Sequence, residues 1–160
     1  MAADMFLKLE GVDGESKDDS HKKEIDVLSW SWGASQSGTG HVGGGSGAGK
    51  VSVQDLSVTK YVDSSSHQLL LDCCNGQHIK KGTLVVRKAG ATPLEYIKLT
   101  MEDILVSNIH TGGSGGEDRL TETITLNFSK FKYEYTPQKS DGSGDGTKET
   151  GWDIAANKKV

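Results

Sequence analysis

Residues 24–36 constrain the fold more than any other stretch, because they hold two of the chain's three tryptophans in an alternating pattern. Successive side chains of a β-strand point to opposite sides, so a period of two predicts a strand. The pattern places Leu28, Trp30, Trp32 and Ala34 on one face and Ser29, Ser31, Gly33 and Ser35 on the other. Ile25 and Val27 hold the opposite phase, which predicts a β-bulge near Val27–Leu28. We expect a strand with an apolar side and a small, hydroxyl-rich side.

Length and composition favour one β-rich domain over residues 1–160. Glycine accounts for 21 of the 160 residues, which is about twice the usual share of roughly 7%. The chain has only two prolines, so the excess of glycine indicates turns and bulges between strands. The net charge is −4, with acids and bases well mixed. This pattern argues against nucleic-acid binding and against an anionic membrane surface.

The chain order predicts one helix among several strands. A helix is expected over 64–74, with Asp63 at its start and Gly76 in a left-handed position after its end. Its buried stripe is predicted to consist of Leu69, Leu70 and Cys73. The expected strands cover 4–10, 24–36, 51–62, 83–88, 95–101, 102–110 and 120–135.

The alternation changes phase at 54–55 and at 129–130, and such changes are typical of bulged, strongly curved sheets. Together with the bulge near Val27–Leu28, they favour a mainly β fold. We predict a single antiparallel β-barrel, or rolled two-sheet structure, with one short α-helix and an extended glycine-rich loop over 37–50.

No catalytic, cofactor or metal site is predicted. Residues 44–50 resemble a phosphate-binding loop, but Val51 stands where that loop needs Ser or Thr and a strand is expected to follow. The five histidines are dispersed and lack ligand spacing. Cys73 and Cys74 are neighbours, which disfavours a disulfide between them. We therefore expect a protein that is not an enzyme.

Several long segments resemble the Hcp (haemolysin-coregulated protein) family of bacterial type VI secretion systems. The resemblance covers nearly the whole chain. It is carried by residues 3–8, 24–38, 47–61, 111–122 and 151–153.

The resemblance implies a protomer of a homohexameric ring that is related in fold to phage tail-tube proteins. Rings would stack into the inner tube of the secretion machine, carry and protect effector proteins in the lumen, and meet its sheath and spike proteins. The protein would start in the bacterial cytoplasm and leave through the machine without a cleaved signal peptide or membrane insertion. The sequence departs from the family at His67, where proline is common, and at the Cys73–Cys74 pair.

Two groups of residues are candidates for these functions. Ser29, Ser31 and Ser114 are expected to face the lumen and touch effectors, although merely solvated serines are the alternative. The glycine-rich loop is expected to contact a neighbouring ring or subunit through Gly40, His41, Val42, Gly43, Gly44 and Gly45. The competing hypothesis for the whole chain is a monomeric β-domain that binds a small ligand or glycan.

Overall fold

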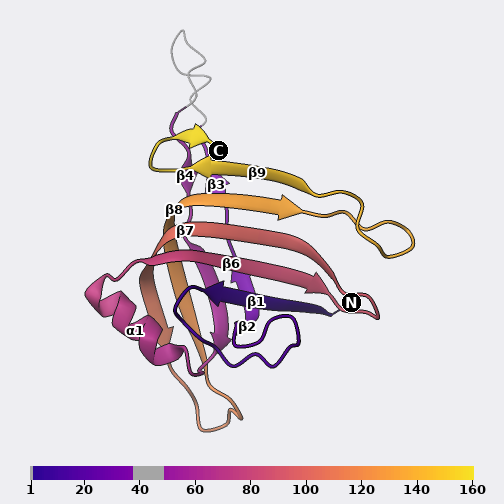
Figure 1. Ribbon diagram of the computed structural model, residues 1–160. Helices are drawn as coiled ribbons and strands as arrows, with labels where there is room; N and C mark the ends of the chain where they lie inside the picture. The colour runs from indigo at the N-terminus through magenta and orange to yellow at the C-terminus, as the bar shows by residue number, and fades with distance from the viewer. Residues whose placement is uncertain (1, 38–48) are drawn as a thin grey trace.

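The computed structural model describes residues 2–37 and 49–160. Six antiparallel strands close into a barrel in the order β8-β5-β2-β1-β6-β7, with β7 pairing back to β8, while β9 and β10 extend the sheet beyond β8 (Figure 1). The elements are β1 (Ala3–Leu9), β2 (Ile25–Ser31), β3 (Ala34–Ser35), β4 (Ser52–Val53), β5 (Leu56–Tyr61), α1 (Ser66–Asn75), β6 (Ile79–Lys88), β7 (Leu94–Thr111), β8 (Thr121–Tyr135), β9 (Lys148–Asp153) and β10 (Lys158–Lys159). The predicted β-barrel with a helix is confirmed.

The bulge predicted in the tryptophan strand is present in β2. Its register against β5 shifts between Val27, which pairs with Lys60, and Ser29, which pairs with Thr59. Leu28 is the extra residue and remains 39% exposed, whereas Val27 is buried. The expectation that Leu28 shares the apolar face with Trp30 is therefore wrong, because the bulge keeps Val27 inside and turns Leu28 out.

One long strand replaces the two that were expected over 95–101 and 102–110. β7 runs unbroken from Leu94 to Thr111, and its register with β8 is constant across Asp103, from Ile97 to Val106, and shifts only between Val106 and Asn108. Asp103 has φ 56 and, like Ser129 on β8, makes no ladder pair. Both strands change face at this level, so the predicted switch at 129–130 occurs without a change of register.

The phase change predicted at 54–55 has a different cause. The chain does not bulge there but passes from β4, in a separate two-stranded sheet with β3, into β5 of the barrel. Trp32 fixes this crossing, because its Nε1 donates to the Gln54 carbonyl at 2.9 Å. The Gln54 amide in turn donates to the Gly33 carbonyl at 2.9 Å. The predicted bulge is therefore wrong.

Local hydrogen bonds define where α1 begins and where it ends. The helix begins two residues later than predicted, because Ser65 and not Asp63 occupies the N-cap position. Asp63 precedes it and accepts a 2.9 Å hydrogen bond from the Ser65 amide. Gly76 has φ 68, and its amide donates to the Asp72 carbonyl at 3.0 Å. The left-handed ending predicted at Gly76 is confirmed, because glycine adopts this conformation without steric cost.

The buried stripe of α1 is narrower than predicted. Leu69 is fully buried and Cys73 packs against the core, but Leu70 is 51% exposed. α1 contacts the barrel along a single line of side chains that includes Leu69. Leu70 is the next residue along the helix and points away from that line, so it lies outside the contact.

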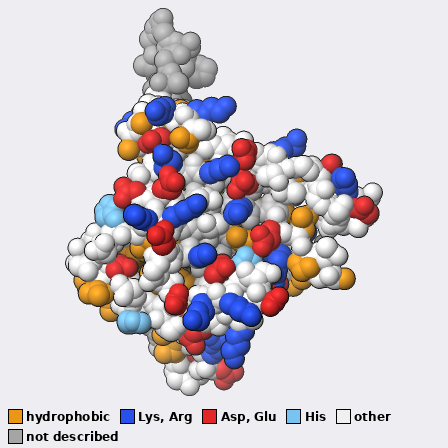
Figure 2. All heavy atoms as spheres, viewed as in Figure 1, with side chains coloured by type: hydrophobic (Ala, Val, Ile, Leu, Met, Phe, Trp, Pro, Cys, Tyr) orange, Lys and Arg blue, Asp and Glu red, His pale blue; other side chains and the backbone are white. Residues whose placement is uncertain are grey.

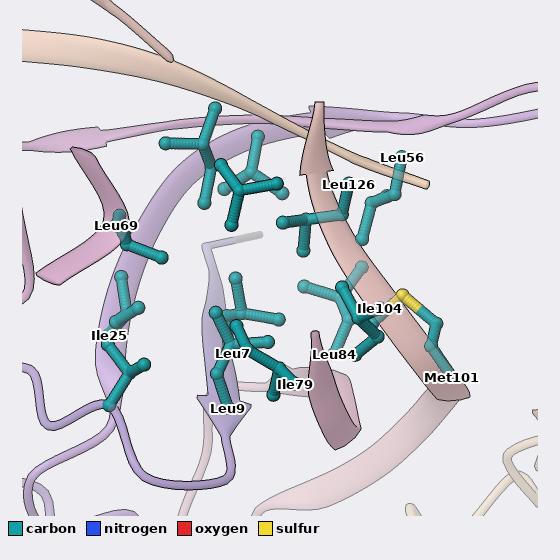
Figure 3. Packing of buried hydrophobic residues seen from close by; sticks show 14 of the residues in the cluster. Leu7, Leu9, Ile25, Leu56, Leu69, Ile79, Leu84, Met101, Ile104 and Leu126 are labelled. Carbon is teal, nitrogen blue, oxygen red and sulfur yellow. The ribbon is translucent and has the colours of Figure 1, made fainter. Parts of the chain in front are cut away.

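Aliphatic side chains fill the interior of the barrel. Figure 3 shows Leu7, Ile25, Leu84, Ile104 and Leu126 converging from different strands, with Leu69 of α1 at the edge of the cluster. These side chains are all fully buried. A six-stranded barrel of this kind is a packed core, not a pore. Any channel must therefore lie between chains.

A candidate functional site on the outer face of the barrel

A hydroxyl-rich surface covers the outer side of four neighbouring strands. Two cross-strand rows define it, and we call their eight residues the hydroxyl face. The first row is Ser31 on β2, Ser57 on β5, Thr125 on β8 and Asn108 on β7, and the second is Ser29, Thr59, Thr123 and His110 on the same strands. All eight side chains are partly or fully exposed.

The same alternation that builds the core builds this face. On β5, Leu56 and Val58 are fully buried, and Ser57 between them points outward. On β8, Ile124 and Leu126 are fully buried on either side of Thr125. Because side chains alternate along a strand, the inward aliphatic residues dictate that the hydroxyl residues share the outer surface.

The hydroxyl face carries no charged side chain when His110 is neutral. The Thr59 and Thr123 hydroxyl oxygens lie 3.5 Å apart across the ladder. Short hydroxyl side chains keep the surface smooth while leaving donors and acceptors for a contacting surface.

Charged groups border this face at its two ends. At one end Asp55 accepts hydrogen bonds from Ser107 Oγ and Asn127 Nδ2, each at 2.8 Å. At the other end the Arg119 guanidinium lies 3.7 Å from the ring centre of Tyr61. The charged residues therefore frame the face and leave its middle neutral.

The structure brings two of the predicted lumen residues together. Ser29 and Ser31 are exposed and lie one in each row of the hydroxyl face. Ser114 is exposed in the loop between β7 and β8 and lies outside both rows. There its carbonyl accepts the Glu117 amide at 3.1 Å. Their role toward effectors stays a prediction.

The predicted contact loop lies outside the described residues. This applies to all six of its candidates, namely Gly40, His41, Val42, Gly43, Gly44 and Gly45. Lys50 is followed, after Val51, by β4 and not by a helix.

Sequence reasoning missed six members of the hydroxyl face. The signal was present, because the segments 56–61 and 121–127 alternate aliphatic and hydroxyl residues. What the sequence does not contain is the register that aligns these strands. The missed residues are Ser57, Thr59, Asn108, His110, Thr123 and Thr125.

The most deeply buried ionic network lies behind this face, at the start of α1. Lys60 is fully buried, and its Nζ lies 2.5 Å from Glu122 Oε1 and 3.0 Å from Asp63 Oδ1. The Ser66 hydroxyl donates to the same Glu122 oxygen at 2.6 Å. Each charge has an opposite partner, so the network holds α1 against β5 and β8.

A second surface, which is charged, covers the long strands β6 to β9. Figure 2 shows basic (blue) and acidic (red) side chains interleaved over this side of the molecule. Lys132 lies 3.1 Å from Glu149 and 3.8 Å from Glu134. The hydrogen bond that Lys132 donates to Glu149 raises the pKa of Lys132 above its ordinary value. This surface differs in chemistry from the neutral hydroxyl face.

Neither a metal centre nor a membrane helix is found within residues 2–37 and 49–160. No three His, Cys, Asp or Glu side chains there converge as metal ligands. Over the same ranges, no helix combines the length and the apolar character needed to span a bilayer.

Comparison with known proteins identifies the family. Residues 6–135 match the family described as "Type VI secretion system effector, Hcp". Protein hcp1 of Pseudomonas aeruginosa is 55% identical over 159 residues, which cover 98% of each chain. Hcp1 of Salmonella typhimurium has a TM-score of 0.83 at 45% identity, with complete coverage of both chains. A structure described as a type six secretion system protein has a TM-score of 0.93 at 33% identity, covering 99% of this chain and all of that one. The chain therefore belongs to the Hcp family of type VI secretion proteins.

Proposed function

We propose that the chain is a structural subunit of the type VI inner tube. Six copies form a ring, rings stack into a tube, and the hydroxyl faces line a lumen that carries effector proteins. Sheath and spike proteins of the same machine are its other partners. The protein leaves the bacterial cytoplasm with the tube.

This proposal rests on the hydroxyl face, which lies on the outside of a barrel whose interior is filled. The interior of the barrel is filled by the aliphatic core, so one chain offers no passage for a protein. A neutral, smooth outer face is suited to line a passage formed by several chains, because it lacks side chains that would trap a moving cargo.

The edges of the sheet that bears this face support assembly. Among the described residues, β1 pairs with β2 only at Asp26 and Ile25, so residues 28–31 have no neighbouring strand on that side. The pairing of β6 with β7 ends at Ile104, which leaves residues 105–111 paired only with β8. Unpaired strand edges attract other chains. A head-to-tail contact repeated by rotation closes into a ring.

Light scattering on the purified protein tests the assembly. The expected mass is six times the 17.1 kDa of one chain, and negative-stain images should show rings. A mass of one chain at every concentration would refute the proposal and would favour the monomeric β-domain that binds a small ligand or glycan.

Substitution of Ser31 tests the lumen. Ser31→Gln places a longer side chain in the middle of the hydroxyl face, and we expect it to abolish co-purification of a lumenal effector while rings remain intact. Ser140→Gln is the matched control, because Ser140 is exposed in the loop between β8 and β9, away from this face. Undiminished effector binding by intact Ser31→Gln rings would contradict the lumen assignment.

A further inference from the structure

The ladder between β1 and β2 is the weakest closure of the barrel. Only two residue pairs connect these strands, Phe6 with Asp26 and Leu7 with Ile25. By contrast, β1 pairs with β6 along its whole length, from Ala3 to Leu9. We call the short β1–β2 ladder the seam. The stability of the seam therefore depends on the residues that pack over it.

The connection between the two strands, residues 10–24, folds back on itself beside the seam. The Gly14 amide donates to the Lys23 carbonyl at 2.7 Å, and the Lys23 amide donates to the Ser16 carbonyl at 2.9 Å. A Cβ on Gly14 would lie 2.5 Å from the Glu24 carbonyl oxygen, so the two halves of the segment are tightly apposed. The segment is thus an ordered cover.

His21 joins this cover to the seam. Its ring stacks on Phe6 with a centroid distance of 4.3 Å and an interplanar angle of 9°. Phe6 belongs to the seam, and its side chain is buried under His21. The Arg87 guanidinium also lies near the Phe6 ring, 5.1 Å from its centre. The His21 ring therefore packs over Phe6, which belongs to one of the two residue pairs of the seam.

Both ring nitrogens of His21 meet carboxylates. Nδ1 lies 3.0 Å from each oxygen of Glu24, and Nε2 lies 2.7 Å from Glu95 Oε1 on β7. An ionised carboxylate only accepts hydrogen bonds, and a neutral imidazole has one N–H. Both contacts can be hydrogen bonds to ionised carboxylates only when the ring carries two protons and a positive charge.

Charged groups from several elements surround the ring. Glu24 and Asp18 lie on the same segment, Asp4 on β1, Arg87 on β6 and Glu95 on β7. Arg87 is engaged by Asp18 at 2.7 Å and by Asp4 at 3.1 Å. Glu24 and Glu95 instead face the two ring nitrogens of His21, which brings two carboxylates to a ring that can carry one positive charge.

We propose that His21, when its ring carries two protons, holds residues 10–24 over the β1–β2 seam. We call this arrangement the His21 clasp. With two protons the His21 ring donates hydrogen bonds to both Glu24 and Glu95 and stacks on Phe6. When pH rises and the ring loses a proton, one of the two hydrogen bonds is lost and a carboxylate faces an unprotonated ring nitrogen. The stability that the clasp contributes is thus present at acidic pH and is lost as pH rises.

Amide hydrogen exchange of the assembled protein, followed by mass spectrometry at pH 6.0 and pH 8.5, tests the clasp. After correction for the intrinsic exchange rate at each pH, the protection of residues 10–24 should fall about tenfold at the higher pH, the loss expected for one charge-assisted hydrogen bond. His21→Gln should lower the protection at pH 6.0 to the wild-type level at pH 8.5 and remove its pH dependence.

His78→Gln is the matched control. His78 Nδ1 also contacts a carboxylate, Asp103 at 2.7 Å, but at an exposed position outside the segment. This variant should leave the pH response of residues 10–24 unchanged. Glu95→Gln retains the histidine and removes one charged acceptor, so it should reduce the pH response even if His21→Gln fails to fold. The clasp would be refuted if the protection of residues 10–24 in the wild type did not change with pH, or if His78→Gln abolished that change.

Discussion

Lys60 is the most unusual residue of the barrel, because a fully buried lysine needs charged partners. Glu122 and Asp63 supply them, and both carboxyl side chains are almost entirely shielded from solvent. A buried ion network of this kind contributes little net stability compared with an apolar replacement, but removing one member is costly. Its role is to fix where α1 begins relative to β5 and β8.

Glu122→Ala should therefore destabilise the protein strongly, by about 3–5 kcal/mol in the free energy of unfolding. The physical cause is the Lys60 charge, which would stay buried with Asp63 as its remaining partner. Urea unfolding followed by tryptophan fluorescence measures the effect. The double variant Lys60→Met with Glu122→Leu is the control, and it should recover most of the loss. A small effect of the single variant would show that water reaches Lys60.

Acid should weaken the contact between β6 and the segment 10–24. Hydrogen bonds from the Arg87 guanidinium lower the pKa of Asp18 to about 2. Because this pKa lies below the ordinary value of 3.8, the contribution of Asp18 to stability is complete above that value and is lost as pH falls toward 2. Asp18→Asn should lower the melting temperature at pH 7, and the gap to wild type should close near pH 2. A gap that is constant with pH would contradict this account.

At the scale of elements, glycines show where strands approach most closely. Gly82 on β6 is buried, and a Cβ there would lie 2.7 Å from Leu9 Cδ2 and 2.8 Å from Ile104 Cδ1. The backbone of β6 can therefore lie close to the side chains of β1 and β7. Ordinary van der Waals distances are restored only by moving core side chains.

Gly82→Ala should cost about 1–3 kcal/mol of stability, the usual penalty for overpacking a core. Gly112→Ala is the matched control, because nothing lies within 4 Å of the added Cβ, and its effect should stay within about 0.5 kcal/mol. Thermal unfolding by circular dichroism compares the two variants. Equal melting temperatures would show that Leu9 and Ile104 can repack without cost.

Most elements could be predicted from the sequence, but their limits depend on pairing. Alternation predicted β2 and its bulge, and the Asn75–Gly76 pair predicted the end of α1. The placement of Leu28 was wrong because only the register with β5 shows which residue a bulge expels. The break between β4 and β5 was missed because a strand that leaves one sheet for another has the same alternation change as a bulge.

At the scale of the whole molecule, the barrel could be predicted but the full hydroxyl face could not. Repeated strands, phase changes and a single helix indicated a closed sheet. Ser29 and Ser31 could be identified because they flank a tryptophan in one strand. Thr123 and His110 join them only through the ladders from β2 through β5 and β8 to β7, which place Ser29 in one row with residues 94 and 81 positions further along the chain. Such long-range pairing is a property of the folded chain.

The long ladder between β7 and β8 has a mechanical consequence. It runs from the Ile97–Tyr135 pair to the Thr111–Glu122 pair. A load applied along these strands would be shared by many parallel hydrogen bonds that must shear together, instead of opening one after another like a zipper. The chain should therefore resist a load along this direction, while the short seam at β1–β2 would be the first part to give way.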